Sequence, residues 1–363
     1  MRKFITRTLI VLLILVTIIA LIIGGFYLYF YLKDQEFRKY GGHGFAYMHG
    51  YSSTDFTGYH VYDGEKLVKL DHEADLLIED QEEMPVLDGA EACYPLYCAI
   101  AKTIYKDIDV IEEEIHSLDI KNIDWKDEWI EYIYNNGKIV TFTNSVNGYY
   151  RLIYGDVDLF FGARPSANQM EEARNNNDEI VSIPIGKEAF VFFVEADNPI
   201  DTLSSQQLKQ IYSGEIRNWK QVGGKNQKII AFQRPEESGS QIMMKYFMGD
   251  TKLKDADTIE TIDPMSGIIK KVKQYHNEQG AIGYTFRYFL EELNEEDGVK
   301  MLAIDGVYPS VETIRDGTYP ILVDLVVSKM ESNQKENVDK VINFLLSEDG
   351  QEIIEKTGYG PLN

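Results

Sequence analysis

The chain has 363 residues, with 36 lysines and arginines against 59 aspartates and glutamates, so its formal net charge is -23. This length predicts two lobes or domains, and a hydrophobic content of 44% supports a sizeable core. Such an acidic chain lacks the basic face that nucleic acid requires, which argues against a nucleic-acid-binding protein.

Residues 9–32 form a nearly continuous apolar run that is long enough to span a bilayer. Basic residues precede this run and acidic residues follow it, namely Arg2, Lys3, Arg7, Asp34 and Glu36. This charge bias predicts that residues 1–32 are a cytoplasmic tip and a single-pass anchor in the cell membrane, with the remainder extracytoplasmic. The alternative is a cleaved signal peptide, but its apolar core would be unusually long and no A-x-A site follows it.

Residues 33–84 are rich in Tyr, Gly, Ser and Asp, which predicts an extracytoplasmic stalk or linker. One hairpin is expected over residues 59–70, with its turn at Asp63-Gly64. The histidines of this region match no metal-ligand spacing, so we expect no metal there.

From residue 85 onward, short apolar runs alternate with amphipathic segments, which predicts an α/β fold with mainly parallel strands. Strands are expected at 86–87, 138–142, 157–161, 188–194, 229–232, 281–284 and 321–327. Helices are expected after Gly89, after Asn144 or Ser145, after Gly239, and over 204–212, 266–278, 337–346 and 348–356. The helix over 204–212 has the clearest signals, because Ser204 and Gln207 form a capping box and Gly214 suits its end.

Residues 228–247 predict a buried strand, a loop and then a helix that begins near Ser238-Gly239-Ser240. Serines at this position cap the first N–H groups of a helix, and Gly239 lets a ligand approach the backbone closely. A helix N-terminus attracts anions, and Arg234 adds a charged, bidentate donor. Taken alone, the same residues also fit an ordinary strand-to-helix turn with a surface arginine.

With several other segments, this stretch resembles the phosphate-binding proteins that serve ABC importers. The resembling segments stand in that family's order, namely 88–89, 94–96, 184–194, 198–199, 211–214, 218–219, 223–224, 280–284 and 357–359. The resemblance covers roughly residues 85–362. It implies a two-lobed fold of the periplasmic-binding-protein type II kind, with the ligand held in a cleft between the lobes.

The resemblance also implies the domain limits. Lobe 1 would consist of residues 85–187 and 285–363, and lobe 2 of residues 188–284. Crossing strands near 185–194 and 283–286 would join the lobes, and closure over a ligand would be a hinge motion.

In that family, helix N-termini, hydroxyl groups from both lobes and one arginine hold the ligand. The resemblance implies this role for Arg234, Ser238, Gly239, Ser240 and Ser145. Two positions depart from the pattern, because Glu91 stands where the family has a threonine and Arg164 stands where its best-known members have an aspartate. The first departure removes a donor and adds a negative charge, and the second removes the acceptor that reads a protonated phosphate.

Glu91 and Arg164 would both face the cleft and carry opposite charges. A carboxylate is favoured at a helix N-terminus, so we hypothesise that Glu91 acts as a built-in anion in part of the phosphate site. It would pair with Arg164 or Arg234. The alternative is that Glu91 turns to solvent.

Two functions remain open. The first is a membrane-anchored solute-binding protein that holds phosphate or a related small anion and delivers it to an ABC transporter permease. The second is a membrane-tethered sensor or interaction module of the same fold, with an altered or lost phosphate site. No G-x-S-x-G or H-E-x-x-H motif is present, so we expect neither an enzyme nor a cofactor or metal.

Overall fold

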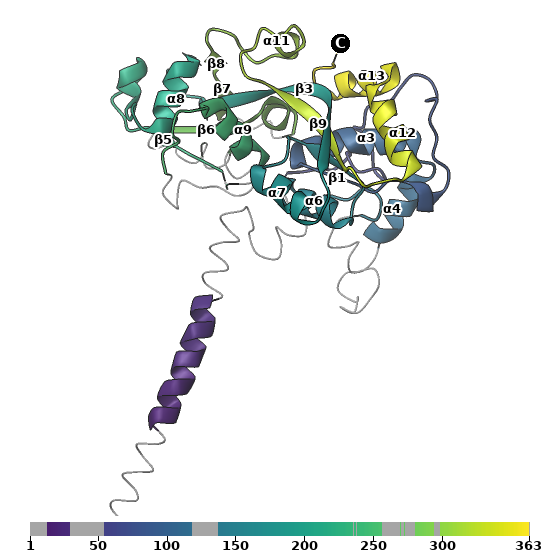
Figure 1. Ribbon diagram of the computed structural model, residues 1–363. Coiled ribbons are helices and arrows are strands. Elements are labelled where there is room, and N and C mark those ends of the chain that lie inside the picture. Colours follow the sequence, from purple (N-terminus) through teal and green to yellow (C-terminus); the bar gives the residue numbers. More distant parts are fainter. Residues whose placement is uncertain are drawn as a thin grey trace, which may run out of the picture.

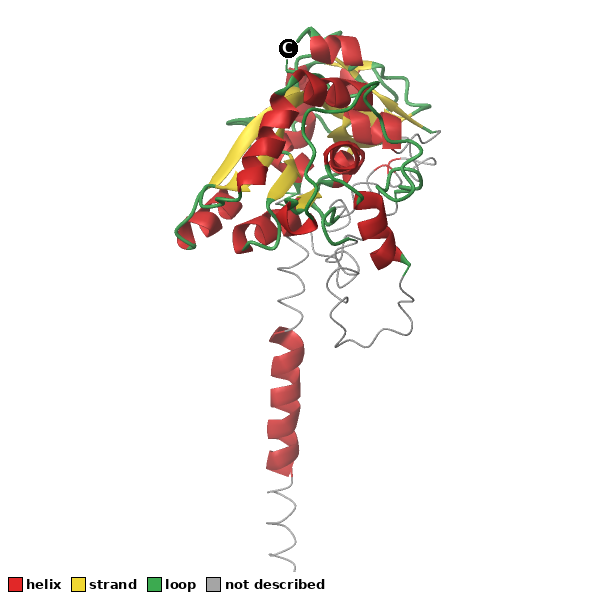
Figure 2. Ribbon diagram, turned by 90° about the vertical axis from the view of Figure 1, so that its right-hand side faces the viewer, coloured by secondary structure: helices red, strands yellow, loops and turns green. Residues whose placement is uncertain are grey.

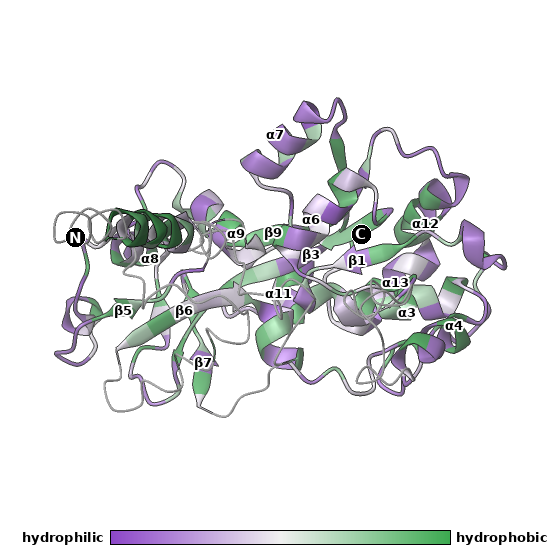
Figure 3. Ribbon diagram, turned by 90° about the horizontal axis from the view of Figure 1, so that it is seen from below, coloured by the Kyte–Doolittle hydropathy of each residue, from purple (hydrophilic) through white to green (hydrophobic). Residues whose placement is uncertain are grey.

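The computed structural model describes residues 13–29, 54–117, 137–234, 236, 238–255, 269, 272, 280–293 and 298–362 (Figure 1). Residues 13–29 form a helix whose large apolar side chains are exposed, and Figure 3 shows it as the most uniformly hydrophobic helix. Within the described ranges, no helix combines the length and the apolar character that a membrane crossing requires. The apolar run over 9–32 extends past this helix at both ends into residues outside the description, so the anchor stays a prediction.

The body is built on one sheet with the strand order β1-β2-β9-β3-β6-β5, to which β7 adds by pairing with β3. Its strands are β1 (Leu87–Gly89), β2 (Leu159–Gly162), β3 (Ile180–Glu195), β5 (Ile230–Ala231), β6 (Ala281–Phe286), β7 (Val299–Met301) and β9 (Leu322–Met330). A small second sheet pairs β4 (Thr202–Leu203) with β8 (Ala303–Ile304).

Helices surround these strands (Figure 2). They are α3 (Tyr94–Ile104), α4 (Ile108–His116), α6 (Ser145–Tyr154), α7 (Ala167–Asn175), α8 (Ser205–Ser213), α9 (Gly239–Met248), α11 (Val311–Arg315), α12 (Glu336–Leu346) and α13 (Glu348–Thr357). The described residues also include short helical turns, namely η1 (Gln81–Glu83), η2 (Glu91–Cys93), η4 (Trp219–Val222) and η6 (Phe289–Leu293).

Strand β3 runs through the whole body. Its first part, Ile180 to Ala189, pairs with β9, and its last part, Phe190 to Val194, pairs with β6. Both pairings are antiparallel, as is the pairing of β2 with β9, whereas β1–β2 and β5–β6 are parallel. The expectation of mainly parallel strands is therefore wrong at the centre of the sheet, because an apolar run indicates burial but not strand direction.

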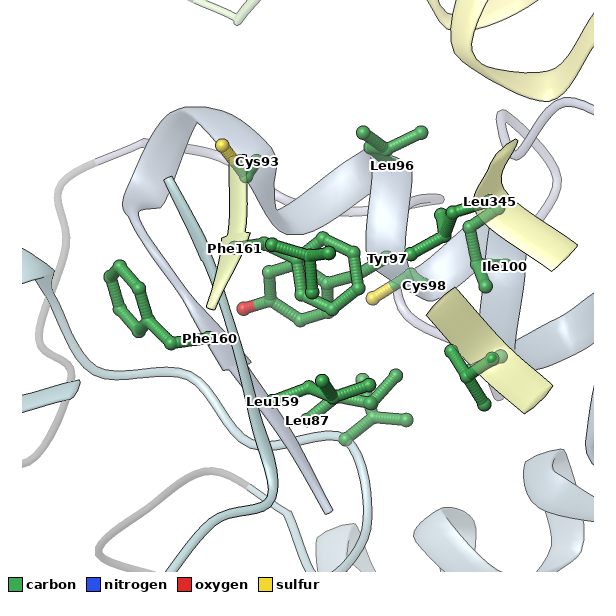
Figure 4. Close-up of a cluster of buried hydrophobic side chains, with 14 of the residues drawn as sticks. Leu87, Cys93, Leu96, Tyr97, Cys98, Ile100, Leu159, Phe160, Phe161 and Leu345 are labelled. Carbon is green, nitrogen blue, oxygen red and sulfur yellow. The ribbon is translucent and has the colours of Figure 1, made fainter. Parts of the chain in front are cut away.

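Buried side chains form two clusters, one on each half of the sheet. We call the part packed around the first cluster lobe 1; Figure 4 shows its centre, including Leu87, Tyr97, Cys98 and Phe161. We call the part packed around the second cluster lobe 2; it includes Phe192, Tyr212, Trp219 and Tyr284. The boundary lies within β3, since Ile185 belongs to the first cluster and Ala189 to the second.

Residues 299–321 pack with lobe 2. Strand β7 pairs with β3, and the buried side chains of this segment join the second cluster, namely Met301, Leu302, Ile304, Ile314, Tyr319 and Ile321. The chain returns to lobe 1 within β9, where Val323 belongs to the second cluster and Leu325 to the first. Assigning all of 285–363 to lobe 1 is therefore wrong, because a periodic apolar face does not reveal which of two cores it covers.

Residues 54–84 belong to lobe 1 rather than to a stalk. Five of their apolar side chains are buried in its core, namely Phe56, Val61, Leu67, Ile78 and Met84. The ring of Phe56 contacts Tyr94 and Phe142, with centroids 4.9 and 5.4 Å apart. These apolar residues are widely spaced among polar ones, so composition suggests a linker where the structure has a packed segment.

Among the helices, strands and turns predicted one by one, some are confirmed and others are wrong. The capping box of Ser204 and Gln207 starts α8, and Gly214 ends it with a φ of 82°. Helices α12 and α13 form as predicted. The hairpin over 59–70 is wrong, since turns replace it, and the strand over 138–142 is reduced to one bridge between Val140 and Leu87. The helix over 266–278 lies almost wholly outside the described residues.

Candidate functional site

The Ser238-Gly239-Ser240 segment forms the start of α9, in lobe 2. Ser238 is the N-cap residue, and its side chain accepts a hydrogen bond from the N–H of Gln241. Gly239 and Ser240 are the first two residues of the helix, and both are buried. The predicted cap is confirmed, and it places early N–H groups of α9 at this end of the helix.

Arg234 is a buried residue, with 4% of its surface exposed. Its Nε donates a hydrogen bond to Ser240 Oγ at 3.3 Å. Its backbone N–H donates to Gln241 Oε1 and to the hydroxyl of Tyr284, at 3.1 and 3.0 Å. Helix α9 and strand β6 therefore both fix the arginine, and the alternative of a surface arginine is wrong.

Ser145 is the first residue of α6, in lobe 1. Asn144 is the N-cap, and its side chain accepts the N–H groups of Val146 and Asn147, both at 2.9 Å. A Cβ added to Gly239 would lie 3.2 Å from Ser145 Oγ, so the starts of α6 and α9 face each other across the lobes. The structure thus brings together Ser145 and Ser238-Gly239-Ser240.

A buried carboxylate holds the lobe 1 side of this site in place. Asp88, at 0% exposure, accepts hydrogen bonds from the N–H of Gly89 at 2.8 Å and from the N–H and hydroxyl of Thr143 at 3.0 and 2.7 Å. Arg151 Nη1 lies 2.5 Å from the same carboxylate. Asp88 therefore ties the end of β1, just before Glu91, to the residue that precedes the Asn144 cap.

Glu91 and Arg164, the two residues that depart from the family's pattern, each interact with another side chain. Glu91 begins η2 and is half-buried, and it accepts a hydrogen bond from the Thr54 hydroxyl at 2.5 Å. Arg164 lies 2.8 Å from Asp324, and the two side chains are 50% and 47% exposed. Residue 54, which the sequence assigns to a stalk, therefore reaches the neighbourhood of the site. A direct pair between Glu91 and an arginine stays a hypothesis.

A cavity of about 20 Å³ lies beside these residues, which is room for about one water molecule. Its lining comes from both lobes, namely Ala90, Ala92, Cys93, Ser145, Gly162, Ala163, Glu188, Phe286, Val323, Asp324, Leu325 and Tyr359. Glu188 is its buried carboxyl group, and burial raises the pKa of that group to about 7. The sequence gives little sign of this role, because Glu188 is one polar residue in an otherwise apolar strand.

Metal binding finds no support in the part of the chain that the structure describes, where no group of three or more potential ligands is present. Cys93 and Cys98 are buried free thiols.

A family model described as "PBP superfamily domain" matches residues 124–349. The phosphate-binding protein PstS of Borreliella burgdorferi is 27% identical over 178 residues, which cover 47% of this chain and 62% of that protein. PstS of Bacillus subtilis is 32% identical over 171 residues, which cover 47% of this chain and 53% of that protein. The match therefore spans less than two thirds of the length of these relatives.

Solved structures share the fold at low identity. A putative phosphate ABC transporter substrate-binding protein with bound phosphate from Clostridium perfringens has a TM-score of 0.51 and 20% identity, over 77% of this chain and 99% of that one. An ABC-type phosphate transport receptor from Vibrio cholerae has a TM-score of 0.50 and 23% identity, over 76% of this chain and 99% of that one.

Proposed function

The chain belongs to the PBP superfamily, and from this premise we propose that it is an extracytoplasmic solute-binding protein for an ABC importer. Its ligand would be phosphate or a related small anion, held between the two lobes. The observation that carries this proposal is the approach of two helix starts from opposite lobes, at Ser145 and Gly239, beside the buried Arg234.

Helix starts offer unpaired N–H groups and a partial positive charge, and arginine adds a full charge with a bidentate fork. An anion bound at the starts of α6 and α9 would receive donors from both lobes at once. Because it would contact both lobes only when they are close, it would shift the population toward the closed arrangement. A ligand without negative charge would gain little from these groups.

The names of the relatives support phosphate as the first ligand to test, since the two relatives described above are named phosphate-binding proteins. Glu91 supports a second candidate function, because it places a carboxylate beside the site, where the Thr54 hydroxyl donates a hydrogen bond to it. In that case the chain would be a tethered sensor or interaction module with a weakened phosphate site.

Calorimetric titration of the full chain with phosphate, sulfate and small carboxylates distinguishes the two functions. We expect one anion to bind with one site per chain. Binding of none of them would favour the sensor or interaction module.

Replacing Arg234 by alanine should weaken anion binding about tenfold to a hundredfold, because a hydrogen bond to a charged group is worth roughly 1.5–3 kcal/mol. Titration of the variant measures the loss. Arg315→Ala is the matched control, since it removes the same charge from an exposed residue of lobe 2 that pairs with Glu355. Unchanged affinity in Arg234→Ala would place the ligand elsewhere.

Residues 9–32 would remain attached as the membrane anchor. Support comes from the length of the apolar run and from the basic residues before it. The mass of the mature protein tests this directly. We expect the intact chain, and a product that begins after residue 32 would refute the anchor.

A further inference from the structure

We propose that anion binding between the lobes is coupled to protonation of Glu188, the buried carboxyl group at the base of the site. This inference rests on the proposed function. Glu188 stands where β3 passes from one lobe to the other, since it pairs with Val323 of β9 while Phe190, two residues later, pairs with Phe286 of β6.

The carboxyl group of Glu188 is held by backbone donors from two segments. Its Oε1 accepts the N–H of Ala189 at 2.7 Å, and its Oε2 accepts the N–H of Tyr288 at 3.2 Å. The second bond joins β3 to the segment that follows β6. With 3% of its surface exposed, Glu188 meets little solvent, and it lines the same small cavity as Ser145.

Among the described residues, Arg287 is the cation that acts on Glu188, and its charge is shared with other groups. Arg287 is 2% exposed and lowers the pKa of Glu188, but its Nη1 is also bonded to Glu291 and lies 3.6 Å from Glu292. Its Nη2 donates to the carbonyl of Gly358 at 2.9 Å. Glu291 in turn raises the pKa of Glu188. Arg287 therefore does not serve as a dedicated counter-ion for Glu188.

Among the other titratable groups around Glu188, the thiol and the phenols carry little charge near neutral pH, and the carboxylate of Asp324 is paired. Burial raises the pKa of the Cys93 thiol to about 12, and it also raises the pKa of the surrounding phenols, namely Tyr288, Tyr319 and Tyr359. Asp324 lines the same cavity from β9 but pairs with Arg164. These groups do not offset the effect of burial on the Glu188 carboxylate. Desolvation therefore dominates, and the pKa of Glu188 rises to about 7.

An anion held at Ser145 would lie next to a cavity that Glu188 also lines and that has room for about one water molecule. Two negative charges with little water between them repel strongly, so the bound state favours neutral Glu188. Above about pH 7 the free protein holds Glu188 ionised, and binding must then take up a proton from solvent. Affinity therefore falls as the pH rises through 7, and it levels off at lower pH, where Glu188 is already neutral.

The test is calorimetric titration of the full chain with inorganic phosphate at about pH 6, 7 and 8, in two buffers of different ionisation enthalpy. After the ionisation of phosphate itself is subtracted, the wild type should bind up to about tenfold more weakly at the highest pH than at the lowest. It should take up about half a proton per phosphate at the middle pH. Glu188→Gln should lose both effects, whereas Glu179→Gln, an exposed residue just before β3, should keep them.

Equal proton uptake in the wild type and Glu188→Gln would overturn the coupling and leave the proposed function standing. Absence of phosphate binding at every pH would overturn both. If Glu188→Gln does not fold, Glu188→Asp, which keeps a titrating carboxyl group, takes its place. The wild-type measurement alone still decides whether the coupling exists. A wild type without proton uptake beyond that of phosphate refutes the coupling.

Discussion

Replacing Asp88 by alanine is expected to lower the free energy of unfolding by about 3–5 kcal/mol, because it removes one partner of a buried ion pair. The Asp88 carboxylate is fully buried, and the side chain of Arg151 beside it is 13% exposed. Without Asp88, both donors of Thr143 lose this acceptor, and the Arg151 guanidinium loses its carboxylate partner and keeps its hydrogen bond to the Thr141 hydroxyl. Unfolding by denaturant, followed by circular dichroism, measures the change.

Two further variants sharpen this experiment. Asp250→Ala changes an exposed aspartate after α9 and should alter stability by no more than about 0.5 kcal/mol. Asp88→Asn keeps the shape and part of the hydrogen bonding, so it should cost less than Asp88→Ala. A loss in Asp88→Ala that is no larger than in Asp250→Ala would show that the pair contributes little.

Replacing Glu91 by threonine is expected to strengthen phosphate binding, because it removes a negative charge beside the site and restores a hydroxyl donor. Two unit charges about 4 Å apart at an effective dielectric near 20 interact by roughly 4 kcal/mol, which is the upper limit of the gain. Glu91 is half-buried, so solvent screening reduces this value. Phosphate titrations of the variant and the wild type under the same conditions measure the difference.

Glu82→Thr is the matched control for the Glu91 variant. Glu82 also lies in a short helical turn, η1, but it is exposed and accepts no hydrogen bond from Thr54. The same change of charge at Glu82 should leave phosphate affinity nearly unchanged at physiological salt. If Glu91→Thr binds phosphate no better than the wild type, Glu91 neither repels the anion nor competes with it.

Features set by neighbouring residues could be predicted from the sequence. The start of α8 depends on Ser204 and Gln207, three residues apart, and its end depends on Gly214. The start of α9 at Ser238 is of the same kind. Such caps are local, so their residues carry the whole signal.

Features that depend on contacts distant in the chain could not be predicted. The burial of Phe56 depends on Tyr94 and Phe142, and no local sequence pattern predicts this burial. The same holds for residues 299–321, which join lobe 2 through the pairing of β7 with β3. Periodicity shows that a face is buried, but the partner that buries it is a property of the fold.

At the site, the resemblance predicts that Ser145 and Ser238-Gly239-Ser240 come together, and the structure places them so. Three supporting residues are missed, namely Thr54, Asp88 and Glu188. Buried carboxylates look like ordinary surface acids in a sequence, because their hydrogen-bond donors come from other segments. The only signal is an acidic residue beside or within an apolar run, as at Asp88 and Glu188.

The continuous β3 strand has a consequence for how tightly the protein can hold a ligand. Strands β3 and β9 cross the lobe boundary as one paired ladder, and β3 continues into its ladder with β6, so relative movement of the lobes can occur by bending and twisting these strands. No backbone hydrogen bond has to break, and each such bond would cost about 0.5–1.5 kcal/mol. Closing the lobes over a ligand would then cost little free energy. Most of the free energy of the contacts between protein and ligand would appear as affinity and as a slow rate of release.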